Sequence, residues 1–167
     1  MSNRGGSVPG VAFCLQLPLE LPPVGPAGMT SGGSFAEARG FGGCHVLVVD
    51  DSATNRRIAE RSLRGLGCTC VLAEDGDEVP DAIAREAFDV ILMDVRMARV
   101  NGDAACVALR ASGYTGVVVA VTGNATAADA VEHARVGFNA TLGKPFGAAE
   151  LRGCLAELKA RGAIRVE

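Results

Sequence analysis

Carboxylates follow two short, largely apolar stretches of this chain, at positions that would bring them together in a folded protein. Asp94 directly follows the uninterrupted apolar run 90–93, and Asp50 and Asp51 follow the predicted strand 45–49. Short apolar runs bounded by polar residues are typical of buried strands in a parallel sheet. Open α/β sheets bind their ligands at the carboxyl ends of the strands. Asp94 is therefore the first candidate for chemistry.

A hydroxyl group and an ammonium group are predicted at the same edge of the sheet. Thr122 follows the apolar run 117–121, and Lys144 comes just after the run 140–142. Taken singly, the acids could begin a helix, Thr122 could cap one, and Lys144 could be an ordinary surface lysine. A lysine is nevertheless unusual here, because arginine supplies 14 of the 16 basic residues.

Together, these five residues suit the acceptance of a phosphoryl group. Three neighbouring carboxylates repel one another and need a cation, and hard oxygen ligands favour Mg²⁺. A carboxylate such as Asp94 can attack phosphorus and form an aspartyl phosphate. The transfer then requires positioning and neutralisation of the phosphoryl oxygens, for which Mg²⁺ on Asp50 and Asp51, Lys144 and Thr122 are the candidates.

The elements that must position these residues alternate along the chain. The predicted strands are 45–49, 69–73, 89–93, 117–121 and 140–142. The predicted helices are 53–66, 77–86, 102–111, 126–135 and 148–160. Pro80 fits the second helix only in its first turn; if Asp75 caps this helix instead, Pro80 would bend it. Strands that alternate with helices predict a three-layer α/β domain with a parallel five-stranded sheet.

Composition separates the two ends from this domain. Gly and Pro make up 15 of residues 1–43, a proportion typical of low-complexity chain, so this segment is predicted to be a disordered linker or tail. Residues 44–162 are predicted to fold, and 163–167 to form a short C-terminal tail. The net charge of -3 does not indicate a basic surface for binding nucleic acid. No apolar run approaches the ~18 residues that a membrane helix needs. The six cysteines lack metal-site spacing, which favours reduced, mostly buried thiols and a cytoplasmic location.

Four motifs in order resemble the receiver domain of two-component response regulators, most of all receivers at the C-terminus of hybrid histidine kinases. The motifs are Val-Val-Asp-Asp-Ser-Ala-Thr-Asn-Arg-Arg (48–57), Met-Asp-Val-Arg-Met (93–97), Val-Thr-Gly-Asn-Ala (121–125) and Gly-Lys-Pro-Phe (143–146). The resemblance covers about residues 44–160. It implies a flavodoxin-like (βα)₅ fold with strand order 2-1-3-4-5, and a phosphorelay partner that is a histidine kinase or a histidine-phosphotransfer protein. It also implies a monomer that is not an enzyme beyond its own phosphorylation and dephosphorylation.

The same resemblance assigns a role to each site residue. The implied roles are phosphoacceptor for Asp94, Mg²⁺ ligands for Asp50, Asp51 and Asp94, a backbone carbonyl ligand for Arg96, and a phosphoryl-sensing switch pair for Thr122 and Lys144.

Two departures from the family pattern accompany these matches. Ala98 stands where the family usually has proline, which predicts a looser loop after Asp94. Thr141 stands where the family has its switch aromatic, and the only tyrosine, Tyr114, lies elsewhere. Two alternatives stay open: a phosphohydrolase of the haloacid-dehalogenase type, whose second aspartate is replaced here by Ser52, and a receiver-type module that binds proteins without phosphorylation.

Overall fold

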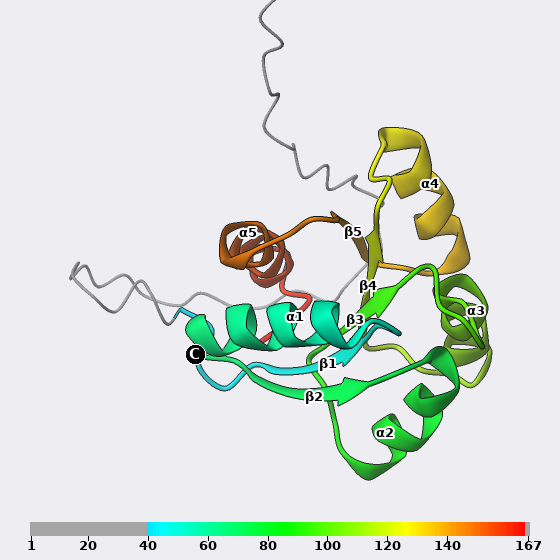
Figure 1. Cartoon of the computed structure of the whole chain (residues 1–167), viewed down its shortest axis with the longest axis horizontal. Helices are drawn as coiled ribbons and strands as arrows, with labels where there is room; N and C mark the ends of the chain where they lie inside the picture. Colours follow the sequence, from blue (N-terminus) through cyan, green and yellow to red (C-terminus); the bar gives the residue numbers. More distant parts are fainter. Residues whose placement is uncertain (1–39, 166–167) are drawn as a thin grey trace, which may run out of the picture.

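The computed structural model describes residues 40–165, which form one parallel sheet covered by helices on both faces (Figure 1). The strands are β1 (His45–Val49), β2 (Thr69–Ala73), β3 (Val90–Asp94), β4 (Val117–Thr122) and β5 (Ala140–Gly143). The helices are α1 (Ala53–Gly65), the 3₁₀ helix η2 (Gly76–Glu78), α2 (Val79–Arg85), α3 (Gly102–Ala111), α4 (Ala127–Val136) and α5 (Ala148–Ala160).

All neighbouring strands are parallel, and their order is β2-β1-β3-β4-β5. This order confirms the flavodoxin-like (βα)₅ fold. Every residue of β3 and β4 is buried, as expected for central strands with both faces covered. Both strands extend one residue beyond the prediction, so that Asp94 and Thr122 are themselves the last residues of β3 and β4.

Two apolar layers hold the helices against the sheet. One lies under α1 and α5 and contains Leu63 and Leu155; the other lies under α2 and α3 and contains Val79 and Leu109. The first layer also buries Phe41 and Ile164, which are 5% and 4% exposed. Buried apolar residues thus also lie just outside the predicted limits 44–162, which stay a prediction, and the rest of the predicted N-terminal linker lies outside the described residues.

The segment between β2 and β3 differs from the single predicted helix 77–86. Asp75 caps η2 by accepting a hydrogen bond from the amide of Gly76, and α2 begins only at Val79. Pro80 lies in the first turn of α2, where a missing amide donor costs no helical hydrogen bond. Dividing the segment into two short helices thus accommodates both the Asp75 cap and the proline.

Candidate functional site

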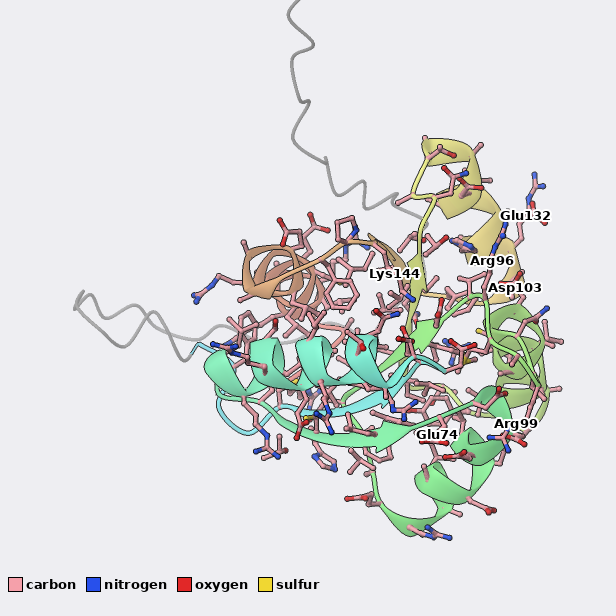
Figure 2. All side chains as sticks on the ribbon, viewed as in Figure 1. Glu74, Arg96, Arg99, Asp103, Glu132 and Lys144 are labelled. Carbon is pink, nitrogen blue, oxygen red and sulfur yellow. The ribbon has the colours of Figure 1, made fainter. Side chains whose placement is uncertain are left out.

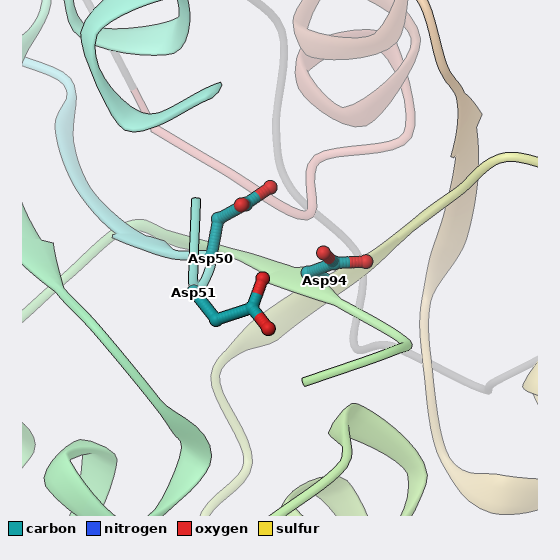
Figure 3. A group of neighbouring side chains, drawn as sticks. All are labelled: Asp50, Asp51 and Asp94. Atoms are coloured by element: carbon teal, nitrogen blue, oxygen red, sulfur yellow. The ribbon is translucent and has the colours of Figure 1, made fainter. Parts of the chain in front are cut away.

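The three predicted carboxylates meet at the carboxyl ends of β1 and β3 (Figure 3). Asp50, Asp51 and Asp94 each offer an oxygen, and these oxygens all lie within 4.8 Å of one another. Asp50 and Asp94 are buried, whereas Asp51 is exposed to solvent. Such a set of hard oxygen donors with one open side fits a Mg²⁺ ion that retains several waters.

Lys144 supplies the positive charge at this site from the loop after β5 (Figure 2). Its Nζ lies 2.8 Å from Oδ2 of Asp50 and 2.7 Å from Oδ2 of Asp94. The Lys144 amide donates to the carbonyl of Thr122 at 2.7 Å, which ties this loop to the end of β4. Burial by itself would lower the pKa of Lys144, but its hydrogen bonds to the two carboxylates raise it above the usual value. One ammonium group leaves the three carboxylates with an excess of negative charge.

Asp50 is held by the first turn of α1. The amide of Ser52 donates to its Oδ1 at 2.9 Å, and Nδ2 of Asn55 lies 3.1 Å from both carboxylate oxygens. Arg56 donates to the backbone carbonyl of Asp50 at 2.7 Å and to the carboxylate of Glu74. The sequence analysis did not identify Asn55 as a site residue, although its place in the first turn after Asp50 was a usable signal.

Asp94 lies in an environment that disfavours its ionised form. Burial raises the pKa of Asp94, and the nearby Asp50 adds to this effect, although hydrogen bonds from Lys144 and from the Arg96 amide oppose it. Gly102 must lack a side chain, because a Cβ there would collide with the carbonyl oxygen of Asp94. The carbonyl of Arg96 as a metal ligand stays a prediction.

The hydroxyl of Thr122 is engaged within its own loop. It accepts a hydrogen bond from the Asn124 amide at 3.2 Å and lies 3.3 Å from the Asn124 carbonyl oxygen. Thr122 thus lies at the predicted edge of the sheet, at the end of β4, which pairs with the strand that ends at Asp94. Its hydroxyl group bonds to residue 124.

The loop after Asp94 is anchored despite the alanine at position 98. The buried carboxylate of Asp75 accepts hydrogen bonds from the amides of Arg99 at 2.9 Å and Val100 at 2.7 Å. The Arg99 side chain also pairs with Glu78 at 2.8 Å. These contacts tie residues 99 and 100 to the loop after β2, and the predicted loosening by Ala98 stays a prediction.

Thr141, at the position of the family's aromatic, is bonded to a buried histidine. Nδ1 of His133 in α4 lies 3.1 Å from Oγ1 of Thr141 in β5, and the two residues are 8% and 7% exposed. The His133 ring also meets Phe138 edge-on, with 5.6 Å between the ring centroids. This pair connects the body of α4 to β5. The sequence analysis missed His133, because a single histidine in an alanine-rich helix carries no spacing signal.

Comparison with known proteins identifies the family. The chain matches the response regulator receiver domain over residues 46–156, which is more than half of its length. It is 32% identical over 104 residues to the transcription factor SKN7 of Saccharomyces cerevisiae, a match that covers 62% of this chain and 17% of that protein. It is 36% identical over 100 residues to the sensor histidine kinase RcsC of Salmonella typhimurium, covering 60% of this chain and 10% of that protein.

A solved structure shares the fold. It is the receiver domain of the sensor histidine kinase PA1611 of Pseudomonas aeruginosa, with a magnesium ion coordinated in its active site cleft. The likeness has a TM-score of 0.62 and 34% identity, and covers 69% of this chain and 96% of that chain. The chain therefore belongs to the response regulator receiver domain family, whose members receive the signal in two-component phosphorelays.

Proposed function

We propose that this receiver accepts a phosphoryl group on Asp94 in a reaction that depends on Mg²⁺. The observation that carries the proposal is the meeting of three carboxylates with Lys144, which contacts both Asp50 and Asp94. Three negative charges against one positive charge suit a divalent cation. The family membership sets aside the phosphohydrolase alternative.

Each side chain has a distinct task in this proposal. An oxygen of Asp94 attacks phosphorus, a new P–O bond forms, and the bond from phosphorus to the donor's histidine nitrogen breaks. Lys144 leaves its ion pair with Asp94 to neutralise one phosphoryl oxygen, and Thr122 releases Asn124 to donate to another. Asn55 and the Ser52 amide keep Asp50 oriented toward the cation. Bound Mg²⁺ on Asp50, Asp51, Asp94 and the Arg96 carbonyl would neutralise the remaining charge.

The donor and partner in this proposal are a histidine kinase or a histidine-phosphotransfer protein. Ile58 on α1 is 47% exposed and lies one turn after the exposed Thr54, on the helix that also presents Asn55 to the site. We assign the contact with the protein donor to this exposed face of α1, next to the reactive edge. We further propose that the chain acts as a cytoplasmic monomer without nucleic-acid contact; among the described residues, no helix is long and apolar enough to cross a membrane.

The test is phosphorylation by acetyl phosphate and by a phosphohistidine protein, measured by intact mass. We expect one added phosphoryl group with Mg²⁺, and none in excess chelator or in Asp94→Asn. The matched control Asp81→Asn, at an exposed α2 carboxylate, should react as the wild type does. Ile58→Ala should slow transfer from the protein donor only. Modification that survives in Asp94→Asn would overturn the assignment.

A further inference from the structure

Two cysteines lie together at the amino ends of β1 and β2, at the opposite end of the sheet from the carboxylates. Cys44 directly precedes β1, and Cys68 directly precedes β2. His45 pairs with Thr69 in the parallel register, and the Thr69 amide donates to the Cys44 carbonyl at 2.9 Å. Cys44 and Cys68 are thus the next pair in this register, and both side chains enter the core layer under α1 and α5.

The geometry of this pair suits a covalent link. Neighbouring strands lie about 4.8 Å apart, and disulfides join residues whose Cα atoms are roughly 4.4–6.8 Å apart. The two sulfhydryl groups are close enough to share a hydrogen bond, and neither is in a disulfide. Cys70 follows Cys68 by two residues along the same strand, a spacing of about 6.6 Å at the limit of that range. Cys106 lies in the other core layer.

We propose that Cys44 and Cys68 are a thiol-oxidation site, where a small hydroperoxide converts them into a reversible disulfide. The sulfur of Cys68 attacks the peroxide oxygen, so that an S–O bond forms, the O–O bond breaks and the leaving hydroxide takes up a proton. The sulfur of Cys44 then attacks that of Cys68, the S–O bond breaks, and the departing oxygen leaves as a second water. Two thiols are oxidised, and one hydrogen peroxide is reduced to two waters.

The surroundings favour Cys68 as the first residue to react. Its pKa is lowered by the hydrogen bond from the Cys44 thiol, whereas the same hydrogen bond raises the pKa of Cys44. Thiolate character favours attack on the oxidant. Cys68 is 4% exposed and Cys44 is fully buried, so the oxidant reaches Cys68 when β2, which among residues 40–165 pairs only with β1, opens locally. Reaction at Cys68 is therefore followed by resolution at Cys44.

The disulfide would change the stability of the receiver. It would close a loop of about 25 residues that contains β1, Asp50, Asp51 and α1, and so restrict the unfolded chain. We expect the oxidised protein to unfold at higher denaturant concentration than the reduced protein. The proposal concerns a different end of the sheet from the phosphoryl site and stands independently of it.

The experiment treats the folded 167-residue chain carrying Cys14→Ser with hydrogen peroxide. Remaining thiols are then blocked with N-ethylmaleimide, and the products are analysed by intact mass and peptide mapping. We expect two thiols protected from alkylation, so that the alkylated product carries two fewer N-ethylmaleimide groups than the alkylated reduced control, and a Cys44–Cys68 peptide that dithiothreitol removes. Cys68→Ser should abolish the product, and the control Cys106→Ser should retain it.

The peptide map of the Cys14→Ser chain, which keeps both Cys44 and Cys68, decides the question even if a core variant fails to fold. A link that joins other cysteines, such as Cys70 or Cys154, would overturn the proposal. So would a link that forms only in denaturant, or oxidation that stops at separate sulfinic acids.

Discussion

At the scale of single residues, the charge of Asp94 opposes folding in the absence of a metal ion. Burial raises its pKa above the usual 3.8, so the folded protein binds this proton more tightly than the unfolded chain does. The protonated carboxyl group therefore contributes to the free energy of unfolding below pH 3.8. This contribution is lost as the pH rises through the folded-state pKa, because the buried group must ionise. At neutral pH the ion pair with Lys144 partly offsets the cost of burying the ionised Asp94 carboxylate.

Asp94→Asn should consequently stabilise the protein without Mg²⁺. The amide removes the repulsion with Asp50 and Asp51, and Lys144 retains its contact with Asp50. We expect a rise in Tm of about 2–4 °C, which corresponds to roughly 1 kcal/mol for a chain of this size. Differential scanning calorimetry in chelator measures it, with Asp81→Asn as the control. An unchanged or lower Tm would argue against electrostatic strain in the acidic cluster.

A second residue-scale prediction concerns the His133–Thr141 pair. Thr141→Val keeps the shape of the side chain but leaves the buried His133 Nδ1 without its hydroxyl partner. An unsatisfied buried polar group costs about 1–3 kcal/mol, and we expect this loss in the free energy of unfolding by urea. Thr141→Ser should recover most of the stability, and Thr115→Val, at an exposed threonine, should show no loss. Equal stability of the valine and serine variants would rule out a role for the hydroxyl.

The sequence predicted the reactive residues better than it predicted their supports. Asp50, Asp51, Asp94 and Lys144 were expected to converge because each follows a strand, and parallel strands end at one edge. Side chains that act through tertiary contacts leave no such pattern. Asp75 accepts hydrogen bonds from the backbone amides of a loop more than twenty residues away in the sequence. His133 in α4 contacts Thr141 in β5.

At the scale of elements, Asp75 joins the loop after β2 to the loop after β3. Burial by itself would raise its pKa, but hydrogen bonds from the amides of Arg99, Val100 and Gly76, together with the Arg99 charge, lower it below the usual 3.8. A lowered folded-state pKa contributes stability that is present above the unfolded value and is lost as the pH falls through the folded value. Asp75 thus makes the fold sensitive to acid.

Asp75→Asn should weaken this junction. The amide group has one acceptor oxygen in place of two and brings donors toward the amides of residues 99 and 100, so we expect a loss of about 1–3 kcal/mol at neutral pH. Below pH 3.8 the gap between variant and wild type should narrow, because the wild type then loses the stability provided by its own carboxylate. Urea unfolding across this pH range measures both effects. A gap that stays constant with pH would contradict the role of the ionised group.

The spacing of apolar residues predicted the helices and strands themselves. Their exact boundaries are set in the structure by capping residues. The predicted helix 126–135 became α4 (Ala127–Val136), because Thr126 and Asp129 form a capping box that places Thr126 outside the helix. The single predicted helix after β2 was wrong because the Asp75 carboxylate caps a separate 3₁₀ turn. The parallel sheet was predictable as a whole, since apolar strands alternating with helices permit few other arrangements.

At the scale of the whole molecule, one set of contacts joins the site to the start of α4, and another joins the body of α4 to β5. Lys144 and Thr122 are joined through the bond between the Lys144 amide and the Thr122 carbonyl. Beyond them, α4 begins with its capping box at Thr126 and is attached to β5 by His133. We therefore expect a displacement of the loop after Thr122 to reach the first turn of α4 and to end where His133 meets Thr141.

We accordingly expect activation to alter a narrow region. Beryllofluoride with Mg²⁺ mimics the phosphoryl group. When it binds, the Thr122 hydroxyl should exchange its hydrogen bond with Asn124 for one with the mimic, and residues 123–129 should move with it. Amide chemical shifts should change strongly over 122–129 and little at His133, Thr141 and α5. Spectra with Mg²⁺ alone separate the effect of the cation at Asp50 and Asp51.

Thr122→Ala should abolish the change over 123–129, because its hydroxyl transmits the displacement, and Thr141→Val should extend the change along α4. Shifts spread through β5 and α5 in the wild type, or dimerisation on activation, would contradict a response confined to this loop.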